Sequence, residues 1–189
     1  MIPYGKQNIT QADIDAVTEV LKSDFLTQGP RILEFEKAFA KYVGSEFALC
    51  VSNGTAALHL SVLALGIESD EFVICTPLTF VASVNCVKYC GGQVYFADID
   101  PNTYLITPEA AEKIIIEDPN KKFKGIIPVD FAGRVVDLEG FNRIAKKYNL
   151  WILEDACHAP GGFMVDSKNS RQKAGGSNYA DASIFSFHP

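Results

Sequence analysis

The sequence contains neither a long hydrophobic run nor a concentration of basic residues. Its longest apolar run, Leu58 to Leu65, is interrupted by Ser61 and is far shorter than the ~20 residues that span a bilayer. No signal or transit peptide is evident. The 17 Lys and Arg residues are scattered among 23 Asp and Glu, for a net charge of -6. We therefore expect no membrane or nucleic-acid partner.

Two common nucleotide-binding motifs are also missing. No Gly-x-Gly-x-x-Gly occurs, and no Gly-Lys-Ser/Thr follows a glycine-rich turn, so a dinucleotide fingerprint and a Walker A loop are both excluded. The five cysteines form no Cys-x-x-Cys pair, and their odd number favours reduced thiols in the cytoplasm. Cys86 and Cys90 would be neighbours on a helix, but no histidines accompany them. We interpret them as core residues rather than metal ligands.

Helical and strand patterns alternate along the 189 residues, of which 48% are hydrophobic, enough for one sizeable core. Thr10 and Asp13 can cap a first helix. A second helix should end at Gly44. This alternation predicts a doubly wound α/β domain. The remaining expected helices are 55–65, 79–89, 108–117 and 138–148; the expected strands are 47–51, 72–75, 93–97, 125–129, 151–153 and the run from Ser183, with a surface hairpin or loop over 166–178.

In such sheets, ligands bind beyond the carboxyl ends of the strands. The turn Ser52-Asn53-Gly54-Thr55 joins an expected strand to a helix, where free N–H groups and the helix dipole favour a phosphate. Gly54 lets the backbone approach closely, Thr55 offers a hydroxyl and Ala56 an N–H. The alternative is a helix cap without a ligand.

Asp155 follows the apolar stretch 151–153, which places a carboxylate at the same edge of the sheet. There it can pair with the ring nitrogen of a pyridine cofactor and keep that nitrogen protonated. The alternative is an exposed acid at a strand end, which is how we interpret the neighbouring Glu154. His158 can hydrogen-bond the cofactor or the substrate, although a packed, satisfied histidine is the competing interpretation.

Two further side chains are candidates for the same pocket. Phe80 lies on the loop after an expected strand, where an aromatic ring can cover one face of a planar cofactor; more often such a residue belongs to the core. Ser186 alternates with Phe185 and Phe187, so its hydroxyl should point into the pocket as a second phosphate ligand. His188 at the end of the chain is less specific.

Six segments together resemble the sugar aminotransferases of the DegT/DnrJ/EryC1/StrS family, in order and at similar spacings across the whole chain. Within this family, the sequence resembles the branch that aminates C4 of a UDP-linked 4-keto-6-deoxy-N-acetylhexosamine on the way to pseudaminic acid. His158 supports this resemblance, because related C3 aminotransferases usually carry glutamine at that position. The segments are Leu26 to Pro30, Ser52 to Leu58, Thr76 to Phe80, Val129 to Gly133, Glu154 to Ala159 and Ser183 to Pro189.

The resemblance implies a large domain of the pyridoxal phosphate (PLP) fold type I, lacking the C-terminal small domain. It implies residues 1–30 as an N-terminal helix with a substrate-side loop, and 31–189 as the PLP-binding domain. It also implies a homodimer, a nucleotide-sugar substrate and L-glutamate as amino donor. The resemblance also implies the role of each candidate residue. The phosphate is bound by Gly54, Thr55, Ala56 and Ser186. Phe80 covers the face of the ring, Asp155 pairs with the ring nitrogen, and His158 lies near the phenolic oxygen.

The resemblance also implies that the Schiff-base lysine lies two residues beyond Pro189 and is not present in this chain. We expect the chain to be the N-terminal half of such an enzyme, inactive alone. Two alternatives remain open. In a family dehydratase, histidine replaces that lysine and a hydroxyl is lost; in a non-catalytic module, PLP or a nucleotide sugar is bound without reaction.

Overall fold

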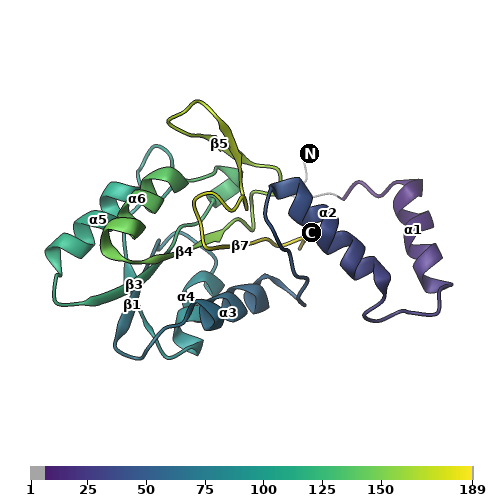
Figure 1. Cartoon of the computed structure of the whole chain (residues 1–189), viewed down its shortest axis with the longest axis horizontal. Helices are drawn as coiled ribbons and strands as arrows, with labels where there is room; N and C mark the ends of the chain where they lie inside the picture. The colour runs from purple at the N-terminus through teal and green to yellow at the C-terminus, as the bar shows by residue number, and fades with distance from the viewer. Residues whose placement is uncertain (1–6, 189) are drawn as a thin grey trace, which may run out of the picture.

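Five parallel strands form the central sheet, in the order β2-β1-β3-β4-β7. The computed structural model describes residues 7–188, and the arrangement of its elements can be followed in Figure 1. The predicted α/β class, with a mostly parallel sheet flanked by helices, is confirmed. The strands are β1 (Glu71–Cys75), β2 (Gln93–Phe96), β3 (Lys122–Ile127), β4 (Trp151–Asp155) and β7 (Ala182–Ile184).

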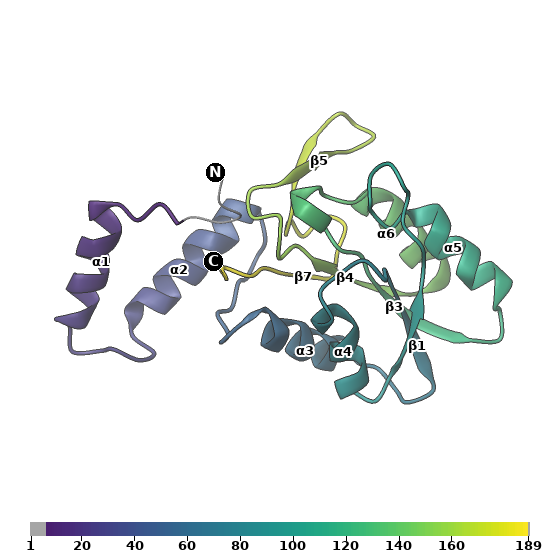
Figure 2. The ribbon, with the colours of Figure 1, turned by 180° about the vertical axis from the view of Figure 1, so that it is seen from behind.

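Helices cover both faces of this sheet. Helices α3 (Gly54–Leu65) and α4 (Ala82–Tyr89) lie on one face, and α5 (Pro108–Glu117) and α6 (Leu138–Tyr148) on the other, as Figure 2 shows from behind. Successive strand residues point to opposite faces. Val73 therefore packs with α3 and α4, whereas the next residue, Ile74, packs with α5 and α6. A fully buried aliphatic side chain contributes about 1.5–3 kcal/mol, so each face has its own stabilising core.

The predicted helix ends are confirmed where they depend on local sequence. Thr10 and Asp13 form a reciprocal capping box at the start of α1 (Gln11–Leu21). Helix α2 (Pro30–Val43) ends at Gly44, whose φ of 87° lies in the left-handed region that favours glycine. These ends are determined by short-range hydrogen bonds, which the sequence specifies directly.

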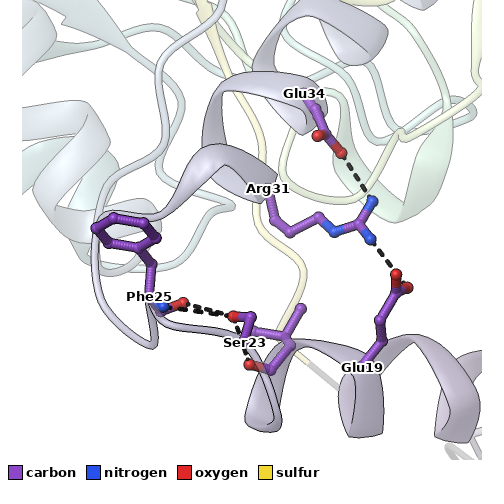
Figure 3. Close-up of polar contacts among 6 residues, drawn as sticks. Glu19, Ser23, Phe25, Arg31 and Glu34 are labelled. Carbon is purple, nitrogen blue, oxygen red and sulfur yellow. Dashed lines mark hydrogen bonds and ion pairs between the residues drawn. The ribbon is translucent and has the colours of Figure 1, made fainter.

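Helices α1 and α2 lie at one end of the molecule, away from α5 and α6 (Figures 1 and 2). Arg31, at the start of α2, links them: its guanidinium contacts Glu19 and Glu34, each at 2.9 Å (Figure 3). Such exposed ion pairs contribute about 0–1 kcal/mol. Helix α1 has no buried residue, so its attachment to the rest of the chain is weak.

The expected strand 47–51 is wrong. This segment has no strand pairing, and its apolar side chains are exposed: Phe47 by 76% and Leu49 by 84%. Its backbone instead contacts a side chain, since the Cys50 N–H donates to Glu36 Oε1 at 2.7 Å. A buried strand needs neighbours on both edges and faces, and no described strand lies beside this segment to supply them.

Two other boundaries differ near the site. Helix α4 begins at Ala82 rather than at Thr79, because the preceding residues form a turn bound by the Ser83 hydroxyl. Strand β4 continues two residues beyond the predicted end at 153. Asp155 is therefore the last residue of the strand and does not lie in the loop that follows it.

The hairpin or loop predicted over 166–178 is present as a hairpin with earlier bounds: it is the antiparallel pair β5 (Phe163–Val165) and β6 (Arg171–Lys173). Strand β7 (Ala182–Ile184) is shorter than the run predicted from Ser183, and Pro189, the last residue of that run, lies outside the described residues. No helix within residues 7–188 has the length and apolar character needed to cross a bilayer.

Candidate active site

Asp155 is the centre of a polar cluster at the carboxyl end of β4. It is 4% exposed. Its Oδ2 accepts a 2.6 Å hydrogen bond from Ser83 Oγ, and its Oδ1 accepts from the Cys157 N–H at 3.2 Å. Both side-chain oxygens therefore have a hydrogen-bond donor, which fixes the carboxyl group at the end of the strand.

Ser83 was not identified from the sequence, yet it connects two predicted site residues. Its side chain is fully buried, and its hydroxyl lies within hydrogen-bond range of the Phe80 carbonyl (3.1 Å), Asp155 Oδ2 (2.6 Å) and Thr79 Oγ1 (2.8 Å). The loop that carries Phe80 is thereby fastened to β4. The sequence feature that could have identified Ser83 is a hydroxyl between the apolar residues at 82 and 84, in the first turn of a helix.

The start of α3 is ordered by its own cap. Asn53 Oδ1 accepts from the Ala56 N–H at 2.8 Å. The Ala56 donor proposed for a phosphate is therefore already engaged in this structure. The N–H groups of Gly54 and Thr55 make no hydrogen bond within residues 7–188, and they lie at the positive end of the helix dipole. An anion can reach these two donors without displacing the cap.

Gly54 brings three distant segments together. A Cβ added there would lie 3.3 Å from Cys157 Sγ and 3.3 Å from Ser186 Cβ, with Ser186 Oγ at 3.7 Å. The absence of a side chain at this position is what lets α3, the turn after β4 and the segment after β7 meet. The predicted convergence of the phosphate turn with Ser186 thus has a direct geometric basis.

His158 is exposed and lies on the turn after β4. Its Nδ1 accepts a 3.3 Å hydrogen bond from the Ala132 N–H, and its ring makes an edge contact with Phe131, with centroids 5.9 Å apart. An accepting Nδ1 leaves Nε2 as the protonated nitrogen of the neutral imidazole. The loop after β3 therefore orients this histidine, and its free nitrogen is the one available for a ligand.

Phe80 is 69% exposed, so its ring is not a core residue. A groove of about 960 Å³ lies between the segment 45–54 and the segment 180–188, and its lining includes Gly54 and Ser186. Asp155, His158 and Phe80 are not part of that lining. The structure therefore places two of the phosphate-side candidates, Gly54 and Ser186, in the groove lining, whereas Thr55 and Ala56 lie outside it together with the other three candidates.

Asp130 and Glu154 lie behind these groups, and both are fully buried. The interpretation of Glu154 as an exposed acid at the strand end is wrong. Its side chain leaves β4 on the side opposite to that of Asp155, as alternate strand residues do, and that side is covered by the turn at Gly175.

The sequence matches the DegT/DnrJ/EryC1/StrS aminotransferase family over residues 7–189. The chain belongs to this family. It is 38% identical over 189 residues to the UDP-4-amino-4,6-dideoxy-N-acetyl-beta-L-altrosamine transaminase of Campylobacter jejuni subsp. jejuni serotype O:2, covering 100% of this chain and 48% of that protein. The chain thus spans about half the length of the curated relatives it matches.

Solved aminotransferase structures have the same fold. Helicobacter pylori PseC, described as an aminotransferase of pseudoaminic acid biosynthesis, matches with a TM-score of 0.85 and 36% identity, covering 98% of this chain and 47% of that one. Bacillus subtilis NtdA with bound cofactor PMP matches with a TM-score of 0.79 and 32% identity, covering 93% and 37%. The predicted fold, a PLP fold type I large domain, is confirmed.

The residues present fit the pyridoxal cofactor that the family implies. At Gly54 a Cβ would occupy the space between α3 and Ser186, and two N–H groups at the start of the helix have no hydrogen-bond partner within residues 7–188. Asp155 supplies a nearly buried carboxylate at the end of the adjoining strand. An anion site beside a carboxylate suits a cofactor with a phosphate at one end and a basic ring nitrogen at the other.

Proposed function

We propose that the full-length protein is a PLP-dependent aminotransferase that moves an amino group from L-glutamate to C4 of a nucleotide-linked 4-keto-6-deoxy sugar. The observation that carries the proposal is the meeting of the α3 start, Ser186 and the turn after Asp155 at one edge of the sheet, in a chain of the aminotransferase family. UDP is the expected nucleotide.

Each candidate residue has a distinct role in this proposal. Gly54 and Thr55, with the hydroxyl of Ser186, bind the phosphate, and Asp155 holds a proton on the ring nitrogen. The protonated ring is an electron sink that makes transfer of an amino group possible. Ser83 keeps the Asp155 carboxylate in place. The Ala56 N–H bonds to Asn53 and so keeps the start of α3 in place for the phosphate, and Phe80 covers the ring face.

The choice of C4 rests on His158 and on the relatives. His158 presents Nε2 while Ala132 fixes the other nitrogen, which suits a hydrogen bond to the cofactor or the sugar. The Campylobacter jejuni relative is named a transaminase of a UDP-4-amino-4,6-dideoxy sugar, and PseC is assigned to pseudoaminic acid biosynthesis. A product destined for a cell-surface polysaccharide is consistent with both.

The active form is a cytoplasmic homodimer with the cofactor sites at the interface. Residues 1–30 provide the substrate side of the site, although 1–6 lie outside the described residues. Residues 31–189 form the large domain. The exposed helix α1 supports a role in assembly, because none of its apolar side chains is buried by the described residues 7–188.

The test is a two-step assay on the full-length protein loaded with PLP. L-glutamate alone should yield 2-oxoglutarate in an amount equal to the enzyme, because the amino group stays on the protein-bound cofactor. Addition of a UDP-4-keto-6-deoxy sugar should then produce the amino sugar, detected by mass spectrometry, and allow further 2-oxoglutarate to form.

The alternatives give different products. A dehydratase would release no 2-oxoglutarate, and its sugar would lose a hydroxyl as water. A binding module would retain PLP and the nucleotide sugar with no change in mass. Either result with a correctly folded protein would overturn the aminotransferase proposal.

A further inference from the structure

Two carboxyl groups are fully buried behind the candidate site and contact no cation. Asp130 follows β3, and Glu154 lies in β4. Each has one oxygen that accepts hydrogen bonds and one that has no donor, namely Asp130 Oδ2 and Glu154 Oε1. Within residues 7–188, no Lys, Arg or His side chain bonds to either group. The two side chains are close enough to hydrogen-bond each other. Two ionised carboxylates at such a buried position, without a cation, are strongly unfavourable, and one proton between them would remove that cost.

The hydrogen-bond donors indicate which group is ionised. Glu154 Oε2 accepts from Ser183 Oγ at 2.6 Å and from the Gly175 N–H at 2.8 Å. Asp130 Oδ1 accepts only from the Val136 N–H, at 3.0 Å. Because donors stabilise a carboxylate, Glu154 is the anion and Asp130 the acid. One O–H···O⁻ hydrogen bond between the two oxygens without donors would satisfy both of them.

The electrostatic surroundings agree with this assignment. Burial raises the pKa of Asp130 to about 9, with the neighbouring charges of Glu154 and Asp155 adding to the effect. Burial also raises the pKa of Glu154, while its bonds from Ser183, Gly175 and Asp130 oppose that shift. Asp155 is the other titratable group that acts on both carboxyls, and its charge disfavours a second one nearby.

We propose that Asp130 and Glu154 share a single proton and act as a positioning pair that fastens the loop after β3 to β4 and β7. Asp130 holds that loop at two points, since its Oδ1 accepts from the Val136 N–H at 3.0 Å and its backbone carbonyl accepts from the Gly133 N–H at 3.1 Å. The same loop carries the Ala132 N–H that orients His158. The shared proton thus supports the histidine side of the site.

This arrangement has a definite pH dependence. Near neutral pH the folded protein holds a proton that the unfolded chain, with an Asp pKa of ~3.9, has lost. The folded state therefore binds more protons, and its stability falls as the pH rises from about 4 to the folded pKa of about 9. Above that value the pair is doubly charged and the loop loses its attachment.

The test uses amide replacements, which supply one hydrogen that does not titrate. Asp130→Asn can donate to Glu154, and Glu154→Gln can donate to Asp130, so each single variant should fold and should flatten the fall of Tm between pH 6 and 9. The double variant places two amide donors against each other. It should be less stable than either single variant, because one amide must give up an existing bond.

Glu139→Gln is the matched control. Glu139 also accepts two hydrogen bonds, from the Ser167 hydroxyl at 2.6 Å and from the Ser167 N–H at 2.8 Å. Unlike the buried pair, Glu139 is solvent-accessible, and these bonds lower its pKa. Its stabilisation is lost as the pH falls, so this variant should leave the alkaline slope unchanged. If both carboxylates were independently ionised, the double variant would instead be more stable than either single variant, and the proposal would be overturned.

Two measurements separate positioning from a merely structural role. Infrared difference spectra should show a protonated carboxylic acid at pH 7 that disappears near pH 9 and is absent in Asp130→Asn. Hydrogen exchange at the Ala132 and Val136 amides should accelerate in Asp130→Ala and return to the original rate in Asp130→Asn. If the variants fail to fold, the infrared spectrum of the unmodified protein decides: a spectrum without a protonated carboxyl at pH 7 refutes the shared proton.

Discussion

Replacement of Asp155 by asparagine separates the charge of this group from its shape. Asparagine occupies nearly the same volume, and its side-chain oxygen can still accept from the Cys157 N–H. Its amide would face Ser83 Oγ, which can accept that hydrogen and direct its own proton to the Phe80 carbonyl at 3.1 Å. The two existing hydrogen bonds can therefore be retained, one of them with its direction reversed, while the negative charge is removed.

The magnitudes expected for folding and for catalysis differ accordingly. The unfolding free energy should change by less than about 1 kcal/mol, which is a Tm shift within ~4 °C for a domain of this size. Loss of an oriented electrostatic contact in an active site typically costs about 100- to 1,000-fold in kcat, or ~2.7–4 kcal/mol. Asp155→Asn should thus be well folded and nearly inactive.

The assay measures 2-oxoglutarate release by the full-length protein at saturating PLP, beside a thermal melt of the same sample. Asp181→Asn is the control, because Asp181 Oδ2 accepts from the Ile152 N–H at 2.8 Å and thus contacts the same strand near the end opposite to Asp155. Its turnover should stay near that of the unmodified protein. Turnover of Asp155→Asn within a few-fold of the unmodified protein would show that this carboxylate does not hold the ring nitrogen.

Three other perturbations test the geometry. Gly54→Ala should weaken PLP binding at least about tenfold in a fluorescence titration, ~1.4 kcal/mol, because the new methyl narrows the phosphate site; unchanged affinity would contradict that location. Gly125→Ala should lower the stability by about 1–3 kcal/mol in a denaturant melt, since its Cβ would overlap the Trp151 ring; a neutral result would mean that the ring can move. Iodoacetamide should modify the exposed Cys50 before the buried Cys75, whose pKa is raised by burial, and peptide mass spectrometry showing the reverse order would refute the packing around β1.

The elements that depend on nearby residues could be predicted from the sequence. The capping box at Thr10 and the left-handed Gly44 are formed within one helical turn, so the sequence contains the whole interaction. The apolar strand around Ile74 and its alternation also follow from a period of two residues. Segment 47–51 is short and apolar like the strand around Ile74, but a strand forms only beside a hydrogen-bonded neighbour. The composition of a segment carries no information about that neighbour.

The site divides in the same way. By itself, the sequence determined that a helix start, a strand-end carboxylate and a histidine occur at the edge where ligands bind, since these follow from the order of strands and helices. Only the tertiary structure decided that Ser83 bonds to Asp155, 72 residues away, and that Glu154 lies buried against Asp130. Local pattern sets which residues a strand contains, whereas the environment of each side chain depends on what distant segments place on that face.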